Sequence, residues 1–392
     1  MLNRCLFVCN AVCLLFICHG SFAAPFRPAD DGDVIEQMAR PVFGSVAELR
    51  AQRAALMRAP QNLRLATKTA QNYILQARAS GEPRFLAYAQ AALNPWWTQK
   101  TAPDDILVLR AIIEQANHRF EAALADLDTV IQRDPRQLQA RLTRASIYQV
   151  QARHGDARRD CAHLLLSGQA EIGTYCLATI SHLSGQTRVS YNALLRFAEQ
   201  SMLATEQRRA TYTLLGEMAA RLGDNSAAER HFLRALAAGS DAYLESAYAD
   251  FLLERGRAKD VLALLGAGPH ADGALLRRAL AQKMLGDRGL ATSLTELRSR
   301  FAAADLRGDT LHQRERARFA LHLDSNPQVA LEYAQRNWRT QREPADARIL
   351  LEAALGAREP SSAKPVAQWL IASRNDEPSL RVLAQRVVAA KS

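Results

Sequence analysis

Residues 212–235 read YTLLGEMAARLGDNSAAERHFLRA and contain two apolar runs separated by a break. In the second run Ala228, Phe232 and Ala235 recur at spacings of four and three residues, which places them on one face of a helix. The break begins at Gly223, and glycine is the residue that most readily adopts the left-handed conformation found at helix ends. The stretch therefore predicts a helix, a tight turn and a second helix.

Comparable pairs of runs occur on both sides of this stretch. Each run repeats apolar or small residues at helical spacing and ends at a glycine, an asparagine or a proline. The chain contains no convincing strand pattern. We expect further helices at 46–57, 63–79, 84–93, 104–116, 121–132, 137–151, 157–166, 172–184, 189–198, 243–254, 259–265, 274–285, 290–304, 314–323, 328–340, 345–357, 366–373 and 380–390.

The pattern of residues 212–235 resembles the tetratricopeptide repeat, a helix-turn-helix unit with a period of about 34 residues. Small residues such as Ala111, Ala145 and Gly216 stand where two helices of that repeat approach closely. The resemblance covers residues 63–304 and implies an all-α fold, a right-handed α-solenoid of stacked antiparallel helix pairs. It also implies a non-enzymatic scaffold that holds a protein or peptide partner and needs no cofactor.

The chain divides into four predicted segments. Residues 1–20 carry an early positive charge and then an apolar run, and Ser-Phe-Ala at positions 21–23 fits a cleavage signal. We therefore expect a signal peptide, a mature chain that starts at Ala24, and export to a bacterial periplasm. A membrane anchor or a lipid-modified Cys18 is the alternative, but the run is short for a span and the residues before Cys18 are bulky. The segments are a signal peptide (1–23), a lead-in with one helix (24–60), tetratricopeptide-like repeats (61–304) and degenerate C-terminal helical repeats (305–392).

Four of the six cysteines lie in the predicted signal peptide, which leaves Cys161 and Cys176 in the mature chain. They fall on consecutive antiparallel helices, so in an oxidising compartment we expect a disulfide between them. Two buried free thiols are the alternative. A tetrahedral metal site with His163 and His182 is not expected, because the spacing fits no known zinc pattern.

The concave face of such a solenoid is the expected binding surface. In the resembling family it is lined by residues of the first helices that lie opposite the packing stripe. Here these groove candidates are Gln139, Ser146, Gln149, Thr213, Glu217, Arg221 and Asp250. The alternative is that each is an ordinary solvated helix position. The candidates do not form the basic set with which some members of that family clamp a carboxylate.

The net charge of +10 indicates a preference for acidic partners. This leaves an alternative function, in which the chain belongs to a polysaccharide secretion system and an arginine-rich surface contacts an anionic polymer. Nucleic acid is not expected as a partner, because the basic residues are spread along the helices and the chain carries an export signal. No apolar run in the mature chain is long enough to predict a membrane span.

Motifs of catalysis are absent from the sequence. It contains no phosphate-binding loop, no H-E-x-x-H, no G-x-S-x-G and, after the signal peptide, no C-x-x-C. Gly266-Ala-Gly268 lacks the third glycine of a dinucleotide loop and follows a helix. We therefore expect no enzymatic activity.

Overall fold

The computed structural model describes residue 30, residues 46–268 and residues 270–390. The predicted signal peptide and the first part of the lead-in lie outside the described residues. The chain divides into two compact units, Met1–Met38 and Ala39–Ser392. All of the described helices belong to the second unit.

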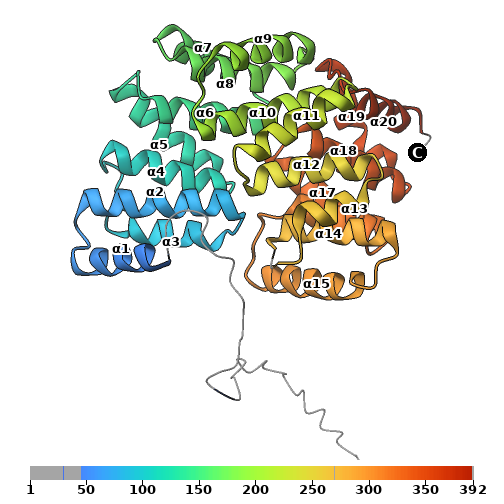
Figure 1. Cartoon of the computed structure of the whole chain (residues 1–392), viewed down its shortest axis with the longest axis horizontal. Coiled ribbons are helices and arrows are strands. Elements are labelled where there is room, and N and C mark those ends of the chain that lie inside the picture. The colour runs from blue at the N-terminus through green and yellow to red at the C-terminus, as the bar shows by residue number, and fades with distance from the viewer. Residues whose placement is uncertain (1–29, 31–45, 269, 391–392) are drawn as a thin grey trace, which may run out of the picture. The chain divides into compact units, whose positions relative to one another are not determined.

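The described residues form helices and connecting turns and contain no strand (Figure 1). The α-helices are α1 (Val46–Arg58), α2 (Leu63–Ser80), α3 (Arg84–Ala92), α4 (Asp104–Ala116), α5 (Phe120–Arg133), α6 (Leu138–Val150), α7 (His154–Leu166), α8 (Ala170–His182), α9 (Thr187–Gln200), α10 (Thr205–Arg221), α11 (Asn225–Ala237), α12 (Ala242–Glu254), α13 (Ala258–Leu265), α14 (Asp272–Leu285), α15 (Leu290–Leu306), α16 (Gln313–His322), α17 (Pro327–Thr340), α18 (Pro344–Gly356), α19 (Lys364–Ala372) and α20 (Pro378–Ala389). Short 3₁₀ helices span Asn94–Trp96 and Pro360–Ala363.

The pair α10–α11 shows why small residues are needed inside a repeat. Gly216 lies against the ring of Phe232, and a Cβ at position 216 would come within 2.9 Å of that ring. Real Cβ atoms essentially never come so close to another atom, so only glycine lets the two helices approach to this distance. The expectation of close packing at Gly216 is confirmed.

Stacking of the pairs makes the structure continuous. The even-numbered helices from α2 to α18 contact one another in order, and α5, α9 and α13 pack on the first helix of the following pair. The predicted all-α solenoid of antiparallel pairs is confirmed, and the fold is tetratricopeptide-like. The stack runs on past residue 304, because Phe301 of α15 packs on Phe319 of α16 with ring centroids 5.5 Å apart.

Most helix starts lie within two residues of the prediction, but two, those of α7 and α10, differ by three residues or more. Residues 154–157 were expected to form a turn because of Gly155, but α7 already begins at His154. The turn lies at Ala152, which adopts a left-handed φ of 60° without being a glycine. Helix α10 begins at Thr205, before the apolar run starts. Its first turn is polar, and the side chain of Gln207 accepts a hydrogen bond from the N–H of Ala204.

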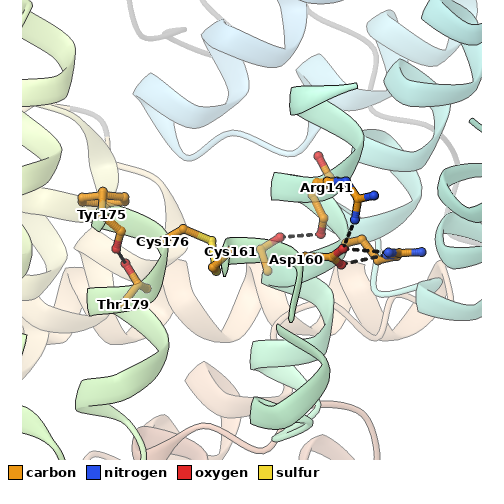
Figure 2. Close-up of a disulfide and its surroundings, with 9 residues drawn as sticks. Arg141, Asp160, Cys161, Tyr175, Cys176 and Thr179 are labelled. Carbon is orange, nitrogen blue, oxygen red and sulfur yellow. Dashed lines mark hydrogen bonds and ion pairs between the residues drawn. A yellow bond between two sulfur atoms is a disulfide. The ribbon is translucent and has the colours of Figure 1, made fainter. Parts of the chain in front are cut away.

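The structure joins Cys161 of α7 to Cys176 of α8 in a disulfide, with the Cα atoms 5.4 Å apart (Figure 2). Next to it, Asp160 is 2% exposed and accepts hydrogen bonds from Arg141 and Arg144 of α6. The disulfide thus ties α7 to α8, and the buried carboxylate ties α7 back to α6. Three consecutive helices are fastened together at this point of the stack.

We expect a reducing agent to lower the melting temperature of the wild-type protein but not that of a Cys161→Ala/Cys176→Ala variant. Closing a loop of this length stabilises a protein by about 3 kcal/mol on the chain-entropy estimate, because it restricts the unfolded chain. Thermal unfolding followed by circular dichroism, with and without the reductant, measures the difference. Equal shifts in both proteins would show that the thiols are not bridged.

Candidate functional site: the interior face of the helix stack

The stack curves far enough to bring distant helices together. Helix α12 contacts α2 (Figure 1). Gly81 after α2 lies against Ala242 and Ala271. The even-numbered helices therefore share an enclosed interior, to which we refer as the interior face. It is this face that the resembling repeats use for binding.

The segment between α17 and α18 docks on the end of α6. The backbone N–H of Arg342 donates to the carbonyl oxygen of Val150 at 2.7 Å. Beside it, Nε2 of Gln149 donates to Oε1 of Glu343 at 3.3 Å. Residues almost two hundred positions apart in the sequence are thus joined through a backbone bond and a side-chain bond.

A second docking contact joins the segment before α20 to the turn between α8 and α9. The N–H and the hydroxyl of Thr187 donate to the two carboxylate oxygens of Asp376, at 2.9 and 2.8 Å. Arg221 at the end of α10 forms an ion pair with Glu377 at 3.6 Å. The C-terminal helix pairs are therefore held against earlier repeats at more than one point, and this contact fixes how open the interior is.

Gly185 makes this second contact sterically demanding. Its φ is +79°, and a Cβ at this position would overlap the carbonyl oxygen of Arg374. Gly223 occupies the corresponding turn after α10 with φ +80°, but no atom lies within 4 Å of its missing Cβ. The two glycines carry the same backbone constraint, and only Gly185 touches the C-terminal segment.

We expect Gly185→Ala to destabilise the protein more than Gly223→Ala. Both variants bear the strain of a non-glycine residue at positive φ, about 1 kcal/mol, and only the first also displaces Arg374. Urea unfolding gives the stabilities, and hydrogen exchange at residues 374–377 reports on the contact. Equal losses, with unchanged exchange in Gly185→Ala, would contradict the docking role.

Four of the seven groove candidates reach other elements of the interior. Gln149 and Arg221 make the docking contacts described above, Asp250 bonds to α14 and α16, and Glu217 bonds to Tyr243 of α12. They are not plain solvated positions.

The other three candidates are placed differently. Thr213 is 2% exposed, and its hydroxyl donates to the carbonyl oxygen of Arg209 in its own helix, so it presents no surface to a partner. Gln139 is exposed and Ser146 is half-buried, and both bond to Thr143 within α6. Thr213 was expected to line the groove as a first-helix residue opposite the packing stripe, but the helix turns it toward its neighbours and buries it.

Asp250 connects three first helices. Its carboxylate accepts hydrogen bonds from Arg277 of α14 and, at 2.9 Å, from Arg318 of α16. Burial would raise the pKa of Asp250, but the two guanidinium groups outweigh it and hold the pKa well below its usual value. The Asp250 carboxylate therefore stays ionised and bonds to both arginines. These bonds fix the relative positions of α12, α14 and α16.

Around Tyr243 the interior face is acidic and open. The hydroxyl of Tyr243 donates to Oε1 of Glu217 at 2.8 Å, and the side chain of Tyr243 is 63% exposed. Its pKa lies well above the usual value: the charge of Glu217 is the first cause and burial the second, and Glu343 and Tyr175 of α8 add to the effect. Tyr243 is therefore accessible to solvent and also within reach of groups on α8, on α10 and in the segment before α18.

The pKa of the Glu217 carboxyl group is shifted in this environment. Burial raises its pKa to about 7, against the opposing effects of Tyr243 and Arg221. Burial also raises the pKa values of Glu254 and Glu343. Burial is the first cause in each case, and a cationic group that entered here would favour the ionised carboxylates.

Tyr243 and Glu343 were not identified from the sequence. Tyr243 is the second residue of its helix, where aromatic side chains have no repeat signature, and Glu343 lies before α18 in a region where the repeat pattern weakens. Both are placed on the interior face by curvature of the stack. The only feature of the sequence that could have identified Tyr243 is that it is an aromatic residue outside the apolar stripe of its helix.

We expect Glu217→Gln to change the pH dependence of stability. The folded pKa of about 7 exceeds the unfolded value of about 4.5, so the folded protein holds an extra proton between these values. The contribution of Glu217 to stability is therefore fully present below pH 4.5 and is lost as the pH rises through 7. Glutamine cannot ionise, so the stability of the variant relative to wild type should increase between pH 4.5 and 8 in urea unfolding.

Glu315→Gln serves as the matched control with the opposite sign. Burial would raise the pKa of Glu315, but Arg314, His312 and Arg277 hold it below its usual value. Its contribution is present above the unfolded pKa and is lost as the pH falls. A Glu217→Gln profile parallel to wild type, or one with the slope of Glu315→Gln, would refute the environment described for Glu217.

The part of the chain that the structure describes holds no group of three or more His, Cys, Asp or Glu side chains arranged to bind a metal ion. None of its helices is both long and apolar enough to cross a membrane.

No protein-family model matches the sequence, and no curated protein matches it. Among solved structures, the chain is similar to the APC/C hetero-tetramer Cut9-Hcn1 (11% identity, TM-score 0.49, covering 84% of this chain and 64% of that one). It is also similar to the human IFIT1 dimer with m7Gppp-AAAA (14% identity, TM-score 0.47, covering 88% of this chain and 86% of that one). A third similar structure is a tetratricopeptide repeat protein from Parabacteroides merdae (13% identity, TM-score 0.31, covering 82% of this chain and 99% of that one). The chain thus spans 64% of the length of the Cut9-Hcn1 chain it matches.

Proposed function

We propose that this protein is a non-enzymatic scaffold that binds a segment of another protein along its interior face. The observation that carries the proposal is Tyr243, a 63% exposed aromatic side chain bonded to Glu217 within the enclosed interior. Tyrosine at a concave surface is a common anchor of protein recognition. Its ring and the neighbouring carboxylates together suit an arginine or a lysine of the bound segment, through cation–π contact and ion pairing.

We further propose that the scaffold acts in the periplasm, with an envelope assembly as its context. The N-terminal charge and apolar pattern supports this location, as does the pairing of Cys161 with Cys176, since disulfides persist in oxidising compartments. The partner is then itself an exported protein or the exported part of one.

Selection of peptides on the immobilised protein tests the binding surface. We expect the selected peptides to contain arginine or lysine and to bind Tyr243→Ala about tenfold more weakly than wild type, a loss of about 1.4 kcal/mol. Fluorescence polarisation with a labelled peptide measures the affinity. Met202→Ala is the matched control, because Met202 is fully exposed in the turn between α9 and α10 and should not contribute.

Peptides that bind Tyr243→Ala and wild type equally well would contradict the proposal.

The second candidate function, contact with an anionic polymer of a secretion system, is supported by the net charge of +10. It predicts binding of an anionic polysaccharide that falls steeply with salt and is unaffected by Tyr243→Ala.

A further inference from the structure

A cleft of about 720 Å³ opens where the C-terminal helix pairs dock on α6. Its walls come from the turn before α5, the segment after α6 and the end of α17 with the residues that follow. We name it the arginine cleft, after the four arginines that line it, Arg119, Arg153, Arg339 and Arg342. Among the described residues that line the cleft, Glu121 is the only acidic one.

Two of the arginines are already neutralised and two are not. Arg119 forms an ion pair with Glu114, and Arg153 forms one with Asp156 at 2.8 Å. In the described part of the chain no carboxylate pairs with Arg339 or Arg342. Among the described residues, the Arg342 side chain donates from Nε to the carbonyl oxygen of Trp338 at 3.4 Å, a long and weak contact. Two exposed guanidinium groups, each with its planar set of donors, thus remain available on one wall.

The opposite wall adds donors that favour the same kind of ligand. Residues 119–122 line the cleft and include the first turn of α5, a 14-residue helix whose N-cap residue makes no side-chain capping bond. The first N–H groups of a helix have no partner within the helix and carry the positive end of its dipole.

We propose that the arginine cleft binds a multiply charged oxyanion of the phosphoryl class. Two unpaired guanidinium groups call for more than one negative charge, and their fork geometry suits two oxygens of one tetrahedral group. The volume is that of a small-molecule site. This inference is independent of the interior-face function, because it uses none of the residues around Tyr243.

The position of the cleft gives the ligand a structural effect. Arg119 and Arg153 belong to early repeats, whereas Arg339 and Arg342 belong to the segment that docks on them through the Arg342–Val150 backbone bond. An anion held by both walls therefore bridges the docking contact and stabilises it. Binding and closure of the stack are coupled at this point.

Isothermal titration calorimetry of the full protein at constant ionic strength tests the proposal, with pyrophosphate, glycerol phosphate and acetate as probes. We expect saturable binding of pyrophosphate, with acetate binding at least about tenfold more weakly. Binding of glycerol phosphate as tight as that of pyrophosphate would assign the site to a phosphate ester, and weaker binding would assign it to a free anion. Either result supports a phosphoryl ligand, whereas equal binding of acetate overturns it.

Arg339→Gln/Arg342→Gln should weaken pyrophosphate binding by at least about tenfold. The control Arg307→Gln/Arg336→Gln removes the same net charge from exposed arginines that do not line the cleft, and it should change the affinity less than about twofold. Hydrogen exchange should show pyrophosphate protecting residues 118–122 and 339–343 in the wild type. Absence of saturable binding, equal losses in both double variants, or protection confined to other segments would each overturn the proposal.

Discussion

The structure depends on one constraint: a helix pair of this chain cannot bury its apolar residues alone. The first helices have buried residues on most of their circumference, as α4 shows with every residue from Ile106 to Glu114 buried. Such a helix must be covered by its own partner and by the pairs before and after it. The chain therefore stacks, and each pair takes its orientation from its neighbours.

Curvature turns this local requirement into long-range contacts. Once α12 has come round to α2, the later pairs meet the early ones, and polar contacts join them in addition to apolar ones. Thr187 with Asp376 and Arg342 with Val150 are examples, and both use backbone groups at helix ends that would otherwise need water. The stack is thus held by apolar packing along its length and by hydrogen bonds where it meets itself.

The interior combines regions of opposite electrostatic character. Around Asp250 the charges are balanced, because arginines from two further helices share the carboxylate. Around Glu217 the effect of burial outweighs that of Arg221, and the pKa of the carboxyl group rises. Balanced charges position helices, whereas unbalanced ones are left for a ligand. The same distinction separates Arg119 and Arg153, which are paired, from Arg339 and Arg342, which have no carboxylate partner among the described residues.

The sequence alone determined the helices, their pairing and the close approach at Gly216, because these depend on residues a few turns apart whose spacing is visible in the chain. It also placed Cys161 and Cys176 on adjacent helices. Only the tertiary structure decided which polar residues face the interior: it buried Thr213, exposed Tyr243 and brought Arg342 to the early repeats. The physical reason is that each of these outcomes depends on a small rotation between successive pairs, which accumulates along the stack and leaves no periodic signal in the sequence.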